Sequence, residues 1–263
     1  MEIHQPHHTT HKKKWSEYVL ESFMLFFAVT LGFFTENYRE HSIIENRMQE
    51  NYRSLIVDLN HDISKIDSIF IDGEKGTNLI ALSHFLYQHK KQIIAEDQLV
   101  DSLYNLGKIP DYNTLFINNA TFKNMQSSGL LSYVTNKDLK TNLSYYYEVI
   151  FKRMDDNNKL FDDVGYNYFN NYLVFQISTN SRNNLSTKSV YNKYENDFKD
   201  IKSYRRFVMD LKSTREILIS EDFIISTNTY IARYYFYQTL LNIVKENNKA
   251  LLQLLEKEIE KFD

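Results

Sequence analysis

A run of apolar residues near the N-terminus constrains this chain more than any other feature. From Phe23 through Phe34 no residue carries a charge, and the wider window from Tyr18 to Thr35 contains a single charged residue, Glu21. The eighteen residues of this window extend about 27 Å as a helix, close to the roughly 30 Å hydrocarbon core of a bilayer. The window therefore has the length of a membrane-spanning helix.

The free energy of insertion favours a span despite Glu21. The window holds ten Leu, Phe or Val residues, worth together about −3 to −6 kcal/mol on an insertion scale. A carboxylate costs about +2.5 to +3.5 kcal/mol at mid-helix and less near a helix end, where Glu21 lies. Two roles for Glu21 stay open: snorkelling and packing near the membrane surface, or a part in ion or proton movement or in pairing with a partner helix.

The flanks of the window predict its orientation. Trp15 and Tyr18 precede the apolar run and Tyr38 follows it, as in the aromatic belts of membrane helices. Three lysines at 12–14 form a basic head, which the positive-inside rule retains in the cytoplasm. We therefore expect residues 36–263 in the bacterial periplasm, although two arginines after the window reduce the charge asymmetry.

A cleaved signal peptide and a buried helix of a soluble protein are the alternatives to an anchor. A basic region followed by a short apolar run is typical of signal peptides. No small-x-small cleavage site follows Phe34, however, and helical periodicity continues past it. These observations favour an uncleaved signal anchor in a single-pass inner-membrane protein.

Composition predicts an all-α fold and excludes several classes of function. Two prolines and six glycines in 263 residues leave few helix breakers, so long helices are expected. The absence of cysteine excludes thiol chemistry and disulfides. A net charge of −3 without a basic stripe argues against nucleic acid as a partner.

Periodicity divides the chain into a head (1–14), a membrane helix (15–38), a stalk helix (39–72) and a helical domain (73–263) of about six helices. The head is histidine-rich and expected to be a flexible linker. Apolar residues recur along the stalk at helical spacing, and this stripe must be covered by helices of the same chain or of a second copy. Its spacing averages slightly above 3.6, which argues against a long left-handed coiled coil. The stripe comprises Ile44, Met48, Tyr52, Leu55, Leu59, Ile63, Ile66 and Phe70.

The helical domain carries recognisable helix and turn signals. Helices are expected over 78–91, 97–105, 119–127, from the residue after Thr135 to about Ile177, over 204–218, and from Glu221 to the C-terminus. Ser127, Ser128 and Gly129 form a structural turn in which Gly129 is left-handed, and Thr135 with Asp138 forms a capping box. Residues 179–197 are polar and predict a long loop. Ser220 caps the last helix, whose stripe includes Leu241, Val244, Asn248, Leu251, Leu255, Ile259 and Phe262.

Two short patterns give the chain a resemblance to an uncharacterised family of single-pass inner-membrane proteins of Bacteroidota. The first is Glu21 followed by Asn37-Tyr38-Arg39-Glu40, where the family has Asn-Trp-Asn-Glu. The second is Thr121-Phe122, the Ser127-Ser128-Gly129 turn and Tyr146-Tyr147 on a later helix. The resemblance covers about residues 12–70 and 114–150. It implies a membrane anchor and a helical domain beyond the membrane, and it implies no reaction or cofactor.

Sequence motifs for catalysis are not found. HExxH, P-loop, dinucleotide-binding and nucleophile-elbow patterns are missing, so we expect no enzymatic activity and no cofactor. Asp58-x-x-His61 is half of a di-metal motif with the wrong acid, and a solvated helix face explains it better. The paired acids at 155–156 and 162–163 are likewise expected to be polar surface rather than a cation site.

These observations favour a non-enzymatic, membrane-anchored scaffold or accessory subunit that binds another envelope protein or itself. Its expected partners are the lipid bilayer and either a second copy or an envelope protein. The alternative is a periplasmic sensor domain that binds a small ligand between its helices and signals through a partner. The abundance of tyrosine on the helix stripes and the loop over 179–197 support this alternative.

Overall fold

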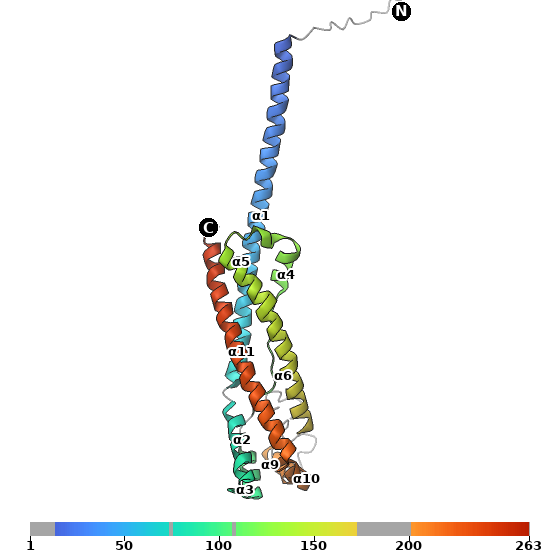
Figure 1. The fold of residues 1–263 in the computed structure, drawn as a ribbon, viewed down its shortest axis with the longest axis vertical. Helices are drawn as coiled ribbons and strands as arrows, with labels where there is room; N and C mark the ends of the chain where they lie inside the picture. Colours follow the sequence, from blue (N-terminus) through green and yellow to red (C-terminus); the bar gives the residue numbers. More distant parts are fainter. Residues whose placement is uncertain (1–13, 74–75, 107–108, 173–200, 263) are drawn as a thin grey trace, which may run out of the picture. The chain divides into compact units, whose positions relative to one another are not determined.

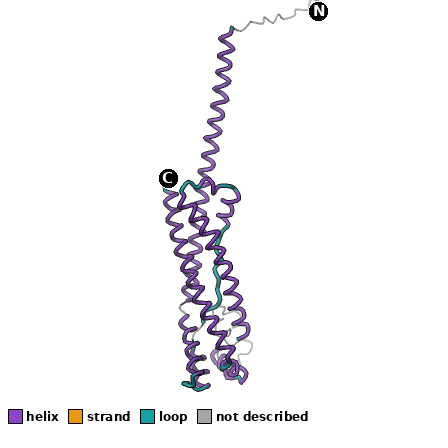
Figure 2. Tube along the Cα trace, in the orientation of Figure 1, coloured by secondary structure: helices purple, strands orange, loops and turns teal. Residues whose placement is uncertain are grey.

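A computed structural model gives the structure of residues 14–73, 76–106, 109–172 and 201–262. The described residues form helices and no strand, which confirms the all-α prediction (Figure 2). The chain divides into a first unit, Met1–Asn51, and a second unit, Tyr52–Asp263. The predicted head, apart from Lys14, and the loop over 179–197 lie outside the described residues.

The first helix, α1, runs from Trp15 to Gly73 and joins the predicted membrane and stalk helices without a break. It ends at Gly73, one residue after the predicted end of the stalk helix. From Tyr52 onward α1 belongs to the second unit. There Tyr52, Leu55, Leu59 and Ile66 are buried, so this part of the apolar stripe is covered by the same chain.

The second unit is a bundle whose longest member is α11 (Glu221–Ile259). In Figure 1, α6 (Phe151–Asn171) lies beside α11, and the two helices are in extensive contact. Stacked aromatic rings fill this contact: the ring centroids of Phe161 and Tyr237 are 4.6 Å apart, and those of Tyr168 and Tyr230 are 5.0 Å apart. The tyrosines on these helix stripes are therefore packing residues of the core. The other helices are α2 (Gly76–Lys90), α3 (Glu96–Asn105), α4 (Ala120–Ser127), α5 (Lys137–Ser144), α9 (Ile201–Asp210) and α10 (Lys212–Leu218).

Three local predictions need correction. Asn136, rather than Thr135, caps α5, because its side chain accepts hydrogen bonds from the backbone N–H groups of Asp138 and Leu139. The helix that was expected over 204–218 is two helices, since Leu211 has extended backbone angles between α9 and α10. The helix that was expected to reach about Ile177 ends at Asn171.

A π-helix, η2 (Tyr145–Ile150), interrupts the long helix between α5 and α6. The extra residue of a π-turn rotates the side chains that precede it relative to those that follow, and such turns are frequent at functional sites. Here it directs two consecutive tyrosines, Tyr146 and Tyr147, into the interior, where both are buried.

Residues 109–119, named here the strap, connect α3 to α4 without forming a helix and run along the bundle (Figure 2). Ile109 and Leu115 are buried on it. A non-helical segment in a core must find partners for its backbone polar groups. Side chains of α1, α6 and α11 provide them, as described below.

Candidate functional site

The predicted membrane residues lie on α1 in the first unit. Trp15 is 83% exposed and Tyr38 is 79% exposed, and Glu21 lies on the exposed surface between them. The most apolar window of this helix has a mean hydropathy of 1.7 and is 0% buried within the structure. Within the described part of the chain, α1 is the one helix that is long and apolar enough to cross a membrane, judged by length and composition. The aromatic and apolar side chains that it exposes match what a bilayer would cover.

The predicted turn at Ser127, Ser128 and Gly129 is confirmed. Gly129 has a φ of 77°, in the left-handed region that glycine adopts without a steric cost. The hydroxyls of Ser127 and Ser128 donate to the backbone carbonyl of Asn124, at 3.2 Å and 2.7 Å. Both side chains therefore serve the helix end.

A buried polar cluster around Asp62 was missed by the sequence reasoning. Asp62 is 0% exposed, although it stands on a helix whose polar residues were expected to face solvent. Its Oδ1 accepts a hydrogen bond of 3.3 Å from the backbone N–H of Asn118, at the end of the strap. The remaining members, which with Asp62 and Asn118 make up the Asp62 cluster, are Asp58, Thr121, Tyr146, Tyr147 and Asn248.

Asp58 of α1 binds the end of the strap and the start of α4 through hydrogen bonds. One carboxylate oxygen accepts from Asn118 Nδ2 at 2.6 Å, and the other accepts from Thr121 Oγ1 at 2.6 Å. Asp58 is half-buried, so the interpretation of the Asp58-x-x-His61 pattern as a solvated face is wrong for Asp58 and holds for His61, which is exposed. The aspartate binds protein donors because the start of α4 is folded against α1.

Two tyrosines of η2 and an asparagine of α11 complete the Asp62 cluster. Asn248 Nδ2 donates to the Tyr146 hydroxyl at 3.2 Å, and that hydroxyl faces the carboxyl of Asp62. No described residue meets Asp62 Oδ2, Tyr147 Oη or Asn248 Oδ1 with hydrogen-bond geometry. Buried polar atoms without partners are uncommon in folded proteins, and their concentration at one place distinguishes this site from the rest of the core.

Burial controls the ionisation of the Asp62 cluster. Desolvation, assisted by the negative charge of Asp58, raises the pKa of Asp62 to about 7, and hydrogen bonds from the Asn118 N–H and the Tyr146 hydroxyl only partly oppose this shift. Burial, together with the negative charge of Asp62, also raises the pKa of Tyr146 and of Tyr147 above the usual tyrosine value. The tyrosines therefore stay neutral at physiological pH, while Asp62 titrates near neutrality.

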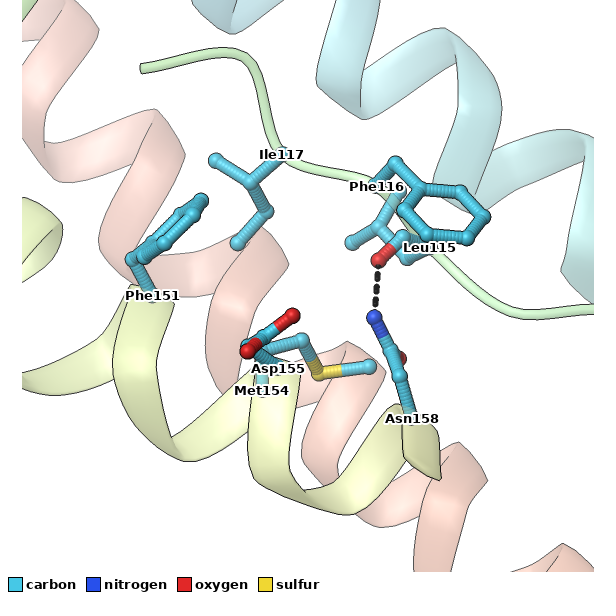
Figure 3. Close-up of a pocket in the computed structure, with 7 residues that line it drawn as sticks. All are labelled: Leu115, Phe116, Ile117, Phe151, Met154, Asp155 and Asn158. Atoms are coloured by element: carbon cyan, nitrogen blue, oxygen red, sulfur yellow. Dashed lines mark hydrogen bonds between the residues drawn. The ribbon is translucent and has the colours of Figure 1, made fainter. Parts of the chain in front are cut away.

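A second buried polar network fixes the middle of the strap. The Tyr237 hydroxyl accepts from the Leu115 backbone N–H at 2.7 Å and donates to Asn158 Oδ1 at 2.7 Å. Asn158 Nδ2 in turn donates to the Leu115 carbonyl at 2.6 Å (Figure 3). Nearer its start, the strap is fixed by the Tyr230 hydroxyl, which donates to the Pro110 carbonyl at 2.7 Å.

Two small cavities lie near the strap and α6. The first, of about 50 Å³, is lined by Leu115, Phe116, Ile117, Phe151, Met154, Asp155 and Asn158, and Figure 3 shows these side chains around it. The second, of about 190 Å³, lies between α6 and α11, and its lining includes Asn167, Asn171 and Thr229. Both are smaller than the roughly 300–1,000 Å³ that is typical of ligand pockets.

No group of three or more His, Asp or Glu side chains suited to a metal ion occurs in the part of the chain that the structure describes. Of the paired acids on α6, Asp155 interacts with Lys159 at 3.3 Å. Comparison with known proteins gives no relative from which a site or an activity can be carried over: no protein-family model, no curated protein and no solved structure matches this chain.

Proposed function

We propose that this protein is a non-enzymatic scaffold or accessory subunit, anchored by residues 15–38 in the bacterial inner membrane, whose helical domain binds another envelope protein or a second copy. One observation carries the proposal: α1 exposes an apolar, membrane-length segment and continues directly into a helical unit whose core is packed with aromatic side chains. A domain of this kind presents surfaces at a membrane. The resemblance to the Bacteroidota family supports the same assignment.

The proposed topology has the N-terminus in the cytoplasm and residues 36–263 in the periplasm, supported by the lysines at 12–14. Protease added to intact spheroplasts is expected to digest the helical domain. A tag at the N-terminus should be protected until the cells are lysed. Protection of the helical domain in intact spheroplasts would reverse the orientation.

The scaffold proposal is tested by crosslinking in native membranes. A photoreactive residue replaces Phe116, which is an apolar side chain 76% exposed on the strap. The control is the same replacement at Lys212, a polar position whose side chain is 91% exposed. A discrete adduct from position 116 that is missing from position 212 supports a specific partner, identified by mass spectrometry.

Position 116 is one point on the surface, so Val149 and Tyr145 of η2, both about half exposed, extend the scan. If no discrete adduct forms at any of these positions, the scaffold proposal is contradicted.

A small-ligand sensor is the second candidate, and the polar lining of the 190 Å³ cavity between α6 and α11 favours it. Amide and hydroxyl groups of Asn167, Asn171 and Thr229 line this cavity and offer hydrogen bonds to a polar ligand. The protein purified from membranes would then carry a small molecule and no protein partner. Replacing Thr229 by a bulkier Leu should remove that molecule without unfolding the domain, since Thr229 is exposed.

A further inference from the structure

Asp62 has an environment that neither a scaffold nor a ligand sensor explains. Its carboxyl is fully buried at the junction of α1, the strap, η2 and α11. The titratable groups that face it are Asp58 and His61 from α1 and Tyr146 and Tyr147 from η2. Asn118 from the strap and Asn248 from α11 are neutral.

No lysine or arginine in the described chain forms an ion pair with Asp62. The nearest basic group is His61, whose Nδ1 lies 4.0 Å from Asp62 Oδ1 and whose side chain is 59% exposed. Asp58 adds a like charge one helical turn away. A buried carboxylate in such surroundings is destabilised, because its attraction to hydrating water is lost and no cation replaces it.

The neutral acid fits the same surroundings. Oδ1 still accepts from the Asn118 N–H, and a proton on Oδ2, which has no partner in hydrogen-bond geometry among the described residues, makes that atom a donor within the Asp62 cluster. The ionised carboxylate can accept from the Asn118 N–H and from the Tyr146 hydroxyl, but Oδ2 has no partner in hydrogen-bond geometry within the described chain, and water would supply one. The end of the strap covers the carboxyl, because the Asn118 N–H binds Oδ1, and its separation from α1 would admit water.

We propose that Asp62 is a proton-controlled latch, which in its neutral form holds Asn118 and the start of α4 against α1 and which loosens this contact when it ionises. Asp58 contributes to the latch because it binds both Asn118 and Thr121. The proposal does not depend on the scaffold function. It provides a route by which a change of pH around the domain alters the surface formed by the strap and α4.

Burial raises the pKa of Asp62 to about 7, which places the transition near neutrality. Since the folded-state pKa lies above the unfolded value of 3.8, the folded state binds the extra proton between these values. Stability from this group is therefore fully present at low pH and is lost as the pH rises through about 7.

The test uses the full chain in detergent micelles and compares wild type with Asp62→Asn, which imitates the neutral acid. Asp67→Asn is the matched control, because Asp67 stands on the same helix, is 48% exposed and pairs with Lys245. Hydrogen exchange of peptides from 109–127 is measured at about pH 5.5 and about pH 8.5 and corrected for the intrinsic rate. We expect exchange in wild type and Asp67→Asn to be faster at the higher pH by roughly tenfold, and Asp62→Asn to lose this difference.

Infrared spectroscopy of the same samples detects the protonated buried carboxyl directly. We expect a carboxylic-acid band in wild type at about pH 5.5 that disappears near pH 7 and is missing from Asp62→Asn. Equal corrected exchange at both pH values in wild type overturns the latch, as does a pH effect retained in Asp62→Asn. If Asp62→Asn does not fold, the wild-type band and exchange decide the question, and absence of the band overturns the proposal.

Discussion

The Tyr237 hydroxyl lies 2.7 Å from Asn158 Oδ1, and through this contact α11 and α6 together hold the backbone of Leu115. Each donor and acceptor in this three-residue ring satisfies another. The strap can therefore cross the core without a helix or a sheet. Any change to one member leaves buried partners unpaired, which makes the network suitable for quantitative tests.

Replacing Tyr237 by Phe is expected to destabilise the second unit by about 2–4 kcal/mol, because the Leu115 N–H and Asn158 Oδ1 lose their partner inside the core. Tyr235→Phe is the control on the same helix. Its hydroxyl donates to the Gly76 carbonyl at 3.2 Å and the residue is 40% exposed, so its loss should cost less than about 1 kcal/mol. Chemical denaturation of the full chain measures both variants. Equal costs would show that the buried network is not a stabilising element.

Gly165→Ala tests the close approach of the strap to α6. A Cβ at this position would lie 2.3 Å from Cβ and Cγ of Tyr112, so the strap must move. We expect a loss of about 1–3 kcal/mol in the free energy of unfolding. Gly32→Ala is the control, because a Cβ there meets no atom within 4 Å. A neutral effect of Gly165→Ala would mean that Tyr112 is held less tightly than the packing indicates.

Asn136→Ala should destabilise more than Thr135→Ala, opposite to the capping box expected from the sequence. Asn136 caps α5, and its Nδ2 also donates to Glu258 at 2.5 Å, which ties α5 to the end of α11. Loss of the cap alone costs about 1 kcal/mol of stability, and loss of the hydrogen bond to Glu258 adds to this cost. Thermal unfolding of the two single variants compares them directly. A larger effect for Thr135→Ala would restore the original assignment.

Glu258 should give the protein an acid-sensitive contact. Burial raises its pKa, but hydrogen bonds from Lys261 and Asn136 and the charge of Lys261 outweigh this, so the pKa lies below the usual 4.5. Because the folded-state pKa is depressed, this contribution to stability is present above about 4.5 and is lost as the pH falls through the folded value. Glu258→Gln should show a smaller loss of stability on acidification than wild type, while Glu260→Gln, at an exposed position, should behave as wild type. Unfolding curves at a series of acidic pH values provide the measurement.

Self-association through the membrane helix stays a prediction, which rests on the position of an ionisable residue, Glu21, in that helix. Light scattering of detergent-purified wild type and Glu21→Leu should show an oligomer that the substitution weakens. If the wild-type protein is monomeric over a broad concentration range, the prediction of self-association is wrong. Leu59→Asp, which the stripe pattern offers as a second probe, is unsuitable, because Leu59 is fully buried within its own chain and the variant should unfold the second unit.

The sequence by itself determined the helices, since their signals are local. Scarce glycine and proline, the apolar window from Tyr18 to Thr35 and the Gly129 turn each act through neighbouring residues, and the structure confirms the all-α fold, the continuous α1 and the left-handed glycine. The cap of α5 and the break between α9 and α10 were predicted wrongly. Asn136 and Thr135 are adjacent residues with similar capping preference, and the choice between them depends on Glu258, which is far away in the sequence.

The tertiary structure alone decided which polar residues are buried. Asp62 follows the charged pattern of a solvated helix face, and its burial results from the strap and α4 folding onto α1. The π-helix over Tyr145–Ile150 was not predicted, because it departs from the 3.6-residue period on which sequence patterns depend. Long-range contacts of this kind set the dielectric surroundings of a side chain, and hence its pKa, so the chemical character of Asp62 emerges only once the chain is folded.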